Sequence, residues 1–274
     1  MSRLLINRNT KMKKKLALIG CGYLSEIIAQ AIKDGSLPEY ELIAVLGKDP
    51  IRTKKFADYF NCKPCLDIDV VLALKPEFIA EAASADSVID YTERILAGGA
   101  HIIILSTAAF ADVALYERSI KTASENNTKI YIAGGATGGF NLLQTASFMN
   151  STPIDVTITS KKSPRFISRT PFYKDGLMSI TRPERVFTGT AKTIIDIFPY
   201  VFNVIYATSL ASAGPEATKF NIDAVPNFTG DDYRIEVKGE QVALDLTIKS
   251  GDYAIAAWSV VSILKNAASP VVFM

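Results

Sequence analysis

The sequence predicts an α/β protein in which a parallel sheet covered by helices is followed by a second domain of the α+β class. Two observations favour this. From residue 16 to residue 133, short apolar runs alternate with segments of helical periodicity, as in successive β-α units of a parallel sheet. Beyond residue 150 the alternation weakens, and strand patterns follow one another. We expect a first domain over residues 13–136 and a second, for substrate and dimer contacts, over 137–250. A C-terminal helix within 251–274 should pack back on the first.

A glycine-rich turn joins the first strand and the first helix. The apolar run at residues 16–19 stops at Gly20, and helical periodicity begins two residues after Gly22. Gly20 permits a tight turn, and Gly22 lets the backbone approach a ligand. The amides of Tyr23 and Leu24 at the helix start, together with the helix dipole, favour a pyrophosphate. The turn therefore predicts a Rossmann-type dinucleotide site, with an ordinary tight turn as the alternative.

The residues after the second strand bear on the choice of cofactor. That strand is expected over residues 40–46, and many NAD-binding folds place an acidic residue at its end to hold the ribose hydroxyls. Here Gly47 leaves room, and Lys48 offers a cation for the 2′-phosphate of NADP. Asp49 is an acidic residue close to that position, so NAD stays a candidate cofactor. The alternative interpretation of these charges is a solvated charge run at the start of a helix. The prediction is NADP or NAD.

The rest of the first domain continues the alternation of strands and helices. Ser106 ends the strand that starts at His101, at the edge where ligands of open α/β sheets bind, and we expect it to line the cofactor site. His101 lies at the opposite end of that strand and is interpreted as structural. Strands are expected at 63–65, 78–84, 101–107 and 129–133, and helices at 53–60, 85–96 and 112–126.

A second glycine-rich segment spans residues 134–141. Four glycines in six residues are costly unless the backbone turns sharply or touches a ligand. We expect it to border the nicotinamide, and a hinge between domains is the alternative. Further along the chain, strands are expected at 155–160, 232–237 and 241–248, and helices at 192–198, from residue 203, and at 253–266, where Trp258 belongs to the predicted apolar face.

Composition excludes several classes of function. The chain has 274 residues, of which 49% are hydrophobic and 21% charged, and a net charge of +2, so no basic excess argues for nucleic acid. No apolar run reaches membrane-spanning length, and three cysteines with one histidine predict no metal site. We expect a cytoplasmic protein with reduced cysteines. The basic residues 1–15 are interpreted as a tail before the fold.

At this point the chain resembles the L-aspartate dehydrogenase family of NAD(P)-dependent amino-acid dehydrogenases. The resemblance covers most of the chain from residue 16 onward and implies an oxidoreductase acting on CH-NH2 donors. It also implies that Ala136 and Asn203 contact the cofactor and that the protein is a homodimer formed through its second domain. The segments that carry the resemblance, in the same order as in the family, are residues 106–112, 135–141, 161–164, 188–191, 198–199 and 203–204.

The departures from the family pattern lie on the substrate side. Tyr233 stands where the family has its active-site histidine, and residues 249–253 replace an asparagine-proline-basic-threonine-serine segment. A tyrosine has a reference pKa near 10, so it cannot shuttle a proton at neutral pH unless a nearby cation lowers that pKa strongly. Lys161, Lys162 and Arg234 are the candidates for that cation. A tyrosine packed at a strand start is the alternative.

The hypothesis is an NAD(P)-dependent oxidoreductase acting on a small amino or keto acid, with an altered substrate pocket. Lysines or Arg165 are expected to neutralise the carboxylate of this small-molecule substrate. The main alternative is a non-catalytic dinucleotide-binding sensor or structural homologue. A third reading is a dithiol redox protein that uses Cys62 and Cys65.

Overall fold

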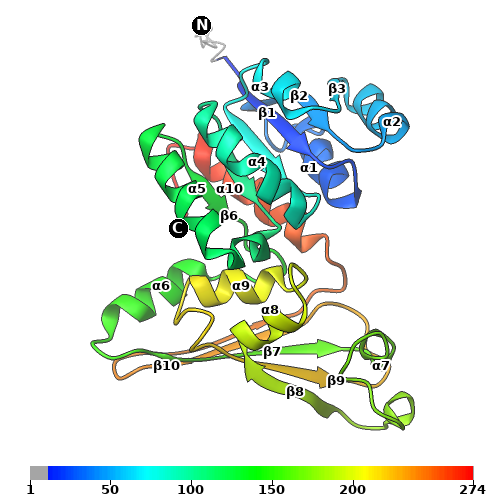
Figure 1. Cartoon of the computed structure of the whole chain (residues 1–274), viewed down its shortest axis with the longest axis vertical. Coiled ribbons are helices and arrows are strands. Elements are labelled where there is room, and N and C mark those ends of the chain that lie inside the picture. The colour runs from blue at the N-terminus through cyan, green and yellow to red at the C-terminus, as the bar shows by residue number, and fades with distance from the viewer. Residues whose placement is uncertain (1–11, 274) are drawn as a thin grey trace, which may run out of the picture.

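The computed structural model describes residues 12–273, which form an upper and a lower layer of sheet and helices (Figure 1). Most of the basic opening segment lies outside the described residues. Its last two residues, Lys14 and Lys15, belong to the first strand of the sheet. The expectation of a tail extending to residue 15 is therefore wrong at its end, because the strand begins two residues before the apolar run that marked it.

The first sheet has six strands in the order β3-β2-β1-β4-β5-β6, all parallel. This is the strand order of the Rossmann fold, so the predicted fold class is confirmed. Leu16, Ala17 and Leu18 have no exposed surface, since helices cover both faces of the sheet. The strands are β1 (Lys14–Ile19), β2 (Tyr40–Leu46), β3 (Lys63–Cys65), β4 (Phe78–Glu81), β5 (His101–Ile104) and β6 (Ile130–Ile132).

The helices of this layer follow the strands as expected, with two additions. A short helix, α3, follows β3 where the sequence pattern predicted no helix, and the Asp67 carboxylate caps it by accepting the amide of Asp69. The 3-10 helix η1 begins at Thr107, where the strand expected at 101–107 was to end. The helices are α1 (Tyr23–Lys33), α2 (Pro50–Phe60), α3 (Ile68–Leu72), α4 (Ala85–Ala97), the 3-10 helix η1 (Thr107–Ala111) and α5 (Val113–Glu125).

The second sheet is mixed, in the order β11-β10-β7-β9-β8, with β7 and β9 parallel and the other pairs antiparallel. In Figure 1, helices α6, α8 and α9 lie between this sheet and the upper layer, and the opposite face of the sheet carries no helix. The elements are α6 (Phe140–Met149), β7 (Asp155–Lys162), α7 (Pro164–Ile167), η2 (Leu177–Ser179), β8 (Glu184–Thr190), α8 (Ala191–Ile197), α9 (Asn203–Leu210), β9 (Lys219–Ala224), β10 (Tyr233–Lys238) and β11 (Ala243–Ile248).

The C-terminal helix α10 (Ile255–Ala268) returns to the first layer and packs against α1. Ala257, Val260 and Leu264 are fully buried there, but Trp258 is 51% exposed. The prediction that Trp258 faces the core is wrong. Successive residues are about 100° apart around a helix, so burying Ala257 turns Trp258 toward the surface. In the part of the chain that the structure describes, no helix is both long and apolar enough to cross a membrane.

Candidate active site

A cavity of about 480 Å³ lies at the carboxyl ends of β1, β2 and β4, where ligands of open parallel sheets bind. The glycine turn after β1 forms one wall. The end of β2 with the start of α2 forms the second wall, and the loop after β4 forms the third. The side chains and backbone that line it include Gly20, Gly22, Gly47, Lys48, Arg52, Ala82, Ala83 and Asp86.

The glycine turn fits a pyrophosphate. Gly20 has φ of +108°, and a Cβ there would lie 2.6 Å from the carbonyl oxygen of Ala82, so a side chain has no room. Gly22 caps α1 without a capping side chain, which leaves the amides of Tyr23 and Leu24 at the positive end of the helix. The Ser25 hydroxyl is buried and has no hydrogen-bond partner among the described residues.

The adenosine end of the cavity is bordered by cations rather than by a free carboxylate. A Cβ on Gly47 would lie 2.1 Å from Oγ1 of Thr53, so an acidic side chain does not fit there unless Thr53 moves. The Asp49 carboxylate accepts the amides of Ile51 and Arg52 and thereby caps α2. Lys48 is largely exposed, and its Nζ lies 3.8 Å from the Asp86 carboxylate. These features favour room for a 2′-phosphate, although the role of Lys48 stays a prediction.

Glu81, at the end of β4, is the residue that sequence reasoning missed. It is fully buried, and its two carboxylate oxygens accept four hydrogen bonds. Oε1 accepts from the Ala83 amide at 2.8 Å and the Ser106 hydroxyl at 2.9 Å, while Oε2 accepts from the amides of Ser106 at 2.9 Å and Leu105 at 3.3 Å. Burial raises the pKa of Glu81, and the four donors oppose that shift. One side chain thus joins the loops after β4 and β5.

Three other predicted cofactor residues line up along the same edge. The Ser106 hydroxyl donates its hydrogen bond to Glu81, so it holds the loop after β5 in place. The Asn203 side-chain oxygen accepts the Ala108 amide at 3.0 Å, and its backbone carbonyl accepts the Thr107 hydroxyl, which fastens α9 to η1. Ala136 is buried in the second glycine segment. The cofactor contacts expected of these three residues stay predictions.

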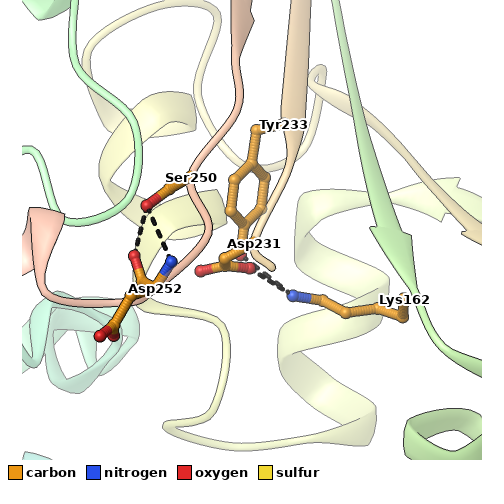
Figure 2. Close-up of polar contacts among 5 residues, drawn as sticks. All are labelled: Lys162, Asp231, Tyr233, Ser250 and Asp252. Carbon is orange, nitrogen blue, oxygen red and sulfur yellow. Dashed lines mark hydrogen bonds and ion pairs between the residues drawn. The ribbon is translucent and has the colours of Figure 1, made fainter. Parts of the chain in front are cut away.

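Tyr233 lies at the start of β10, buried beside a partly buried ion pair (Figure 2). Lys162 Nζ is 2.6 Å from Oδ1 of Asp231 and 3.5 Å from the Tyr233 hydroxyl, and the side chains of Lys162 and Asp231 are only 14% and 22% exposed. Burial, and next the Asp231 carboxylate, raise the pKa of Tyr233. The hydroxyl therefore stays protonated at neutral pH and can donate a hydrogen bond there.

The three cations considered for shifting Tyr233 are separated by the pleat of the sheet. Side chains alternate between faces along a strand, so Lys161 and Arg234 point away from the face of Lys162 and Tyr233. Lys161 lies 3.8 Å from Asp232, and Arg234 is exposed and paired with Asp245. Of these three cations, only Lys162 contacts Tyr233, and the Asp231 carboxylate already neutralises the charge of Lys162.

The segment from β11 to α10 connects this cluster to the glycine turn. The backbone carbonyl of Ser250 accepts the Asp231 amide at 2.9 Å. The Ser250 hydroxyl hydrogen-bonds with the backbone of Asp252 (Figure 2). The Tyr23 hydroxyl donates to Asp252 at 2.7 Å, and its ring lies edge-on to Tyr253. The two ends of the candidate site are therefore joined by direct contacts.

The two residues considered for other chemistry have structural surroundings. His101 Nδ1 accepts the Lys129 amide at 3.1 Å, at the end of β5 far from the cavity edge. Burial raises the pKa of the Cys62 thiol to about 12 and also raises the pKa of Cys65, the opposite of what a reactive dithiol needs. These observations weaken the dithiol alternative.

Comparisons with known proteins cover both layers. Residues 141–267 match the model of the C-terminal domain of aspartate dehydrogenase, and residues 20–133 match that of the NAD binding domain of homoserine dehydrogenase. An L-aspartate dehydrogenase of Methanococcus maripaludis strain C6 is 30% identical over 266 residues, 94% of this chain and 98% of the relative. One of Methanocella arvoryzae is 30% identical over 82% of this chain and 84% of its own length. The crystal structure of aspartate dehydrogenase from Thermotoga maritima has a TM-score of 0.75 at 21% identity, covering 96% of this chain and 100% of that one.

Proposed function

Because the chain belongs to the aspartate dehydrogenase family, we propose that it is an NAD(P)-dependent oxidoreductase acting on the amino group of a small amino acid, or in reverse on the keto acid. One observation carries the proposal. The cavity at the glycine turn has Gly20 held at positive φ against Ala82, and the hydrogen bond from Tyr23 to Asp252 links this turn to the segment beside Tyr233. A dinucleotide and a small acid have their sites on either side of that contact.

The reaction balances without a further oxidant. The amino acid, water and the oxidised dinucleotide give the keto acid, ammonium, the reduced dinucleotide and a proton. When bound, the dinucleotide supplies the acceptor for the hydride that leaves the substrate Cα. The substrate ammonium group first loses a proton, loss of hydride then converts the amine to an iminium, and water adds to the iminium carbon to release ammonium and leave the keto acid.

The chain's own residues hold and orient the reactants in this proposal. The amides at the start of α1, with Gly20 and Gly22, would hold the pyrophosphate, and Lys48 would lie at the ribose. Ser106, Ala136 and Asn203 would border the nicotinamide, where Glu81 fixes the loop that carries Ser106. Tyr233 would act as a protonated hydrogen-bond donor rather than as a base, because burial raises its pKa.

Fluorescence titration with NADH and NADPH tests the shared part of the hypotheses, and absence of binding by both would refute the proposal. A screen of small amino acids with the oxidised cofactors, read at the nicotinamide absorbance, then tests turnover. Binding without turnover of any amino or keto acid would favour the non-catalytic sensor or structural homologue. That alternative has a specific basis, since Tyr233 replaces the family's histidine.

Homodimer formation and a cytoplasmic location are proposed with the activity. The helix-free face of the second sheet is the surface we propose for the dimer, since Thr157, Thr159 and Asn221 on it are half-buried and charged residues on it, such as Lys219 with Asp155 and Arg234 with Asp245, are paired within the chain. Size-exclusion chromatography with light scattering gives the mass directly. A monomer at micromolar concentration would refute the dimer.

A further inference from the structure

The described residues that line the cavity at the glycine turn include two cations with different surroundings. Lys48 follows β2, and its Nζ lies 3.8 Å from the Asp86 carboxylate across the cavity. Arg52 lies in the first turn of α2, where its backbone amide donates to Asp49. Among the described residues, the Arg52 guanidinium forms no ion pair and donates no hydrogen bond. Arg52 can therefore meet a ligand anion without first leaving a partner.

The Arg52 side chain is exposed, yet it reaches the glycine turn. Its Nη2 lies 3.9 Å from the position that a Cβ on Gly22 would take. Arg52 and Cys21 line both this cavity and a second cavity of about 870 Å³, which opens between α1 and α2. The guanidinium therefore lies between two open spaces and has room to turn toward an anion bound at the start of α2.

The wall after β2 lacks the acidic side chain that commonly accepts both ribose hydroxyls of NAD in this fold. Gly47 follows the last residue of β2, and a Cβ there would lie 2.1 Å from Oγ1 of Thr53. Thr53 is itself held in place, since its hydroxyl donates to the Asp49 carbonyl at 2.6 Å. The Asp49 carboxylate accepts two amides through Oδ1, so it serves as the cap of α2.

We propose that the chain prefers NADP to NAD, and that Arg52 sets this preference by donating hydrogen bonds to the 2′-phosphate of the adenosine ribose. The inference rests on the proposed function, because it takes the dinucleotide to lie in this cavity, and it adds the cofactor and its anchor. A guanidinium carries its donors in a planar fork that matches two phosphate oxygens. The amides at the start of α1 are left for the pyrophosphate. Lys48, exposed and close to Asp86, makes a smaller contribution.

Ligands that differ by one phosphate isolate this contact. Fluorescence titration should give a Kd for NADPH at least about tenfold below that for NADH, and 2′,5′-ADP should displace NADPH at least about tenfold better than 5′-AMP does. A Kd for NADPH that is no lower than that for NADH overturns the inference and leaves the proposed function standing. Absence of binding by both dinucleotides refutes the proposed function and this inference together.

Variants of α2 connect the preference to one side chain. Arg52→Gln should raise the Kd for NADPH by about tenfold or more and the Kd for NADH by less than about twofold. Arg52→Lys keeps the charge but not the planar fork, so it should recover only part of the loss.

Lys55→Gln is the matched control. Lys55 is an exposed cation one turn further along α2, and it lines the second cavity but not the first. Like Arg52, it forms no ion pair within residues 12–273. Lys55→Gln removes the same charge from the same helix and should leave the ratio of the two Kd values unchanged.

The pattern of losses decides the assignment. Equal losses of NADPH and NADH binding in Arg52→Gln would place Arg52 at the pyrophosphate and overturn it. Equal changes of the Kd ratio in Arg52→Gln and Lys55→Gln would show that the general charge of α2 sets the preference, which also overturns it. Both side chains are exposed, so both variants should fold, and a melting temperature close to that of the wild type without cofactor checks this.

Discussion

Replacing Glu81 by glutamine tests whether this buried carboxyl holds the edge of the cofactor cavity. Glutamine keeps the shape but has one oxygen, so its NH2 group must face two donors. The least costly orientation places the NH2 group of the glutamine where Oε1 of Glu81 lies. There the Ser106 hydroxyl can rotate and accept a hydrogen bond from the NH2 group. The Ala83 amide then loses its acceptor.

One buried amide without a partner costs about 1–3 kcal/mol, so we expect a loss of about 2 kcal/mol in the free energy of unfolding near pH 5. A loss of that size lowers Tm by about 4–8 °C in a protein of this size. Ala83 also lines the cavity, so the Kd for NADPH should rise in parallel. Chemical denaturation and fluorescence titration measure the two effects.

The pH dependence has a definite sign. Burial raises the pKa of Glu81 above the 4.5 of an exposed glutamate, so the folded state binds the extra proton and loses stability as pH rises through the folded pKa. The variant lacks this loss, so the difference in unfolding free energy between the two proteins should narrow as pH rises above 4.5. Glu77→Gln, at the exposed opposite end of β4, is the control. The reasoning is refuted if Glu81→Gln lowers the free energy of unfolding no more than Glu77→Gln does. It is also refuted if the difference in unfolding free energy between wild type and Glu81→Gln is constant with pH.

Four further substitutions test other parts of the structure. Gly20→Ala should weaken binding of both dinucleotides by about tenfold or more, since its Cβ meets the Ala82 carbonyl; unchanged titrations would exclude the pyrophosphate assignment. Lys48→Asp should weaken NADPH about fivefold more than NADH, as suits an exposed cation, and equal losses would count against a 2′-phosphate contact. Tyr233→Phe should lower turnover without removing an ionisation below pH 10 from the pH–rate profile, because the pKa of Tyr233 is raised; unchanged turnover would take Tyr233 out of the mechanism. Tyr40→Phe should cost about 1.5 kcal/mol of unfolding free energy, since the buried Leu264 carbonyl loses its donor, and urea denaturation with no shift in midpoint would contradict this.

The first layer was predictable because its signals are local. Apolar runs such as residues 16–19 end at glycines, and these boundaries are set within a few residues of sequence. The second layer was predictable only in part. β9 alternates clearly between polar and apolar residues, as Phe220 and Ile222 show, but its parallel partner β7 lies about sixty residues earlier. The pairing of two strands so far apart in the chain leaves no signal in the local sequence.

The site was predictable where backbone geometry decides it and not where side chains pair. Gly20 and the start of α1 form the turn that the sequence indicated. The role of Glu81 depends on Ser106, twenty-five residues further along the chain. Whether Lys162 or Lys161 meets Tyr233 depends on the pleat and on the register of β10 with β7, in which Tyr233 lies opposite Ser160. A single glutamate at the end of a buried strand was the one signal that could have pointed to Glu81.

The return of α10 to the first sheet has a consequence for how the chain is made. The Tyr40 hydroxyl donates at 2.8 Å to the carbonyl of Leu264, 224 residues later, and Lys265 pairs with Glu39. A ribosome that has released the first sheet has therefore not yet released the helix that covers α1. The surface that Ala257, Val260 and Leu264 cover therefore stays open until residues 255–268 have been synthesised. We expect the first layer to reach its full stability only after α10 has left the ribosome.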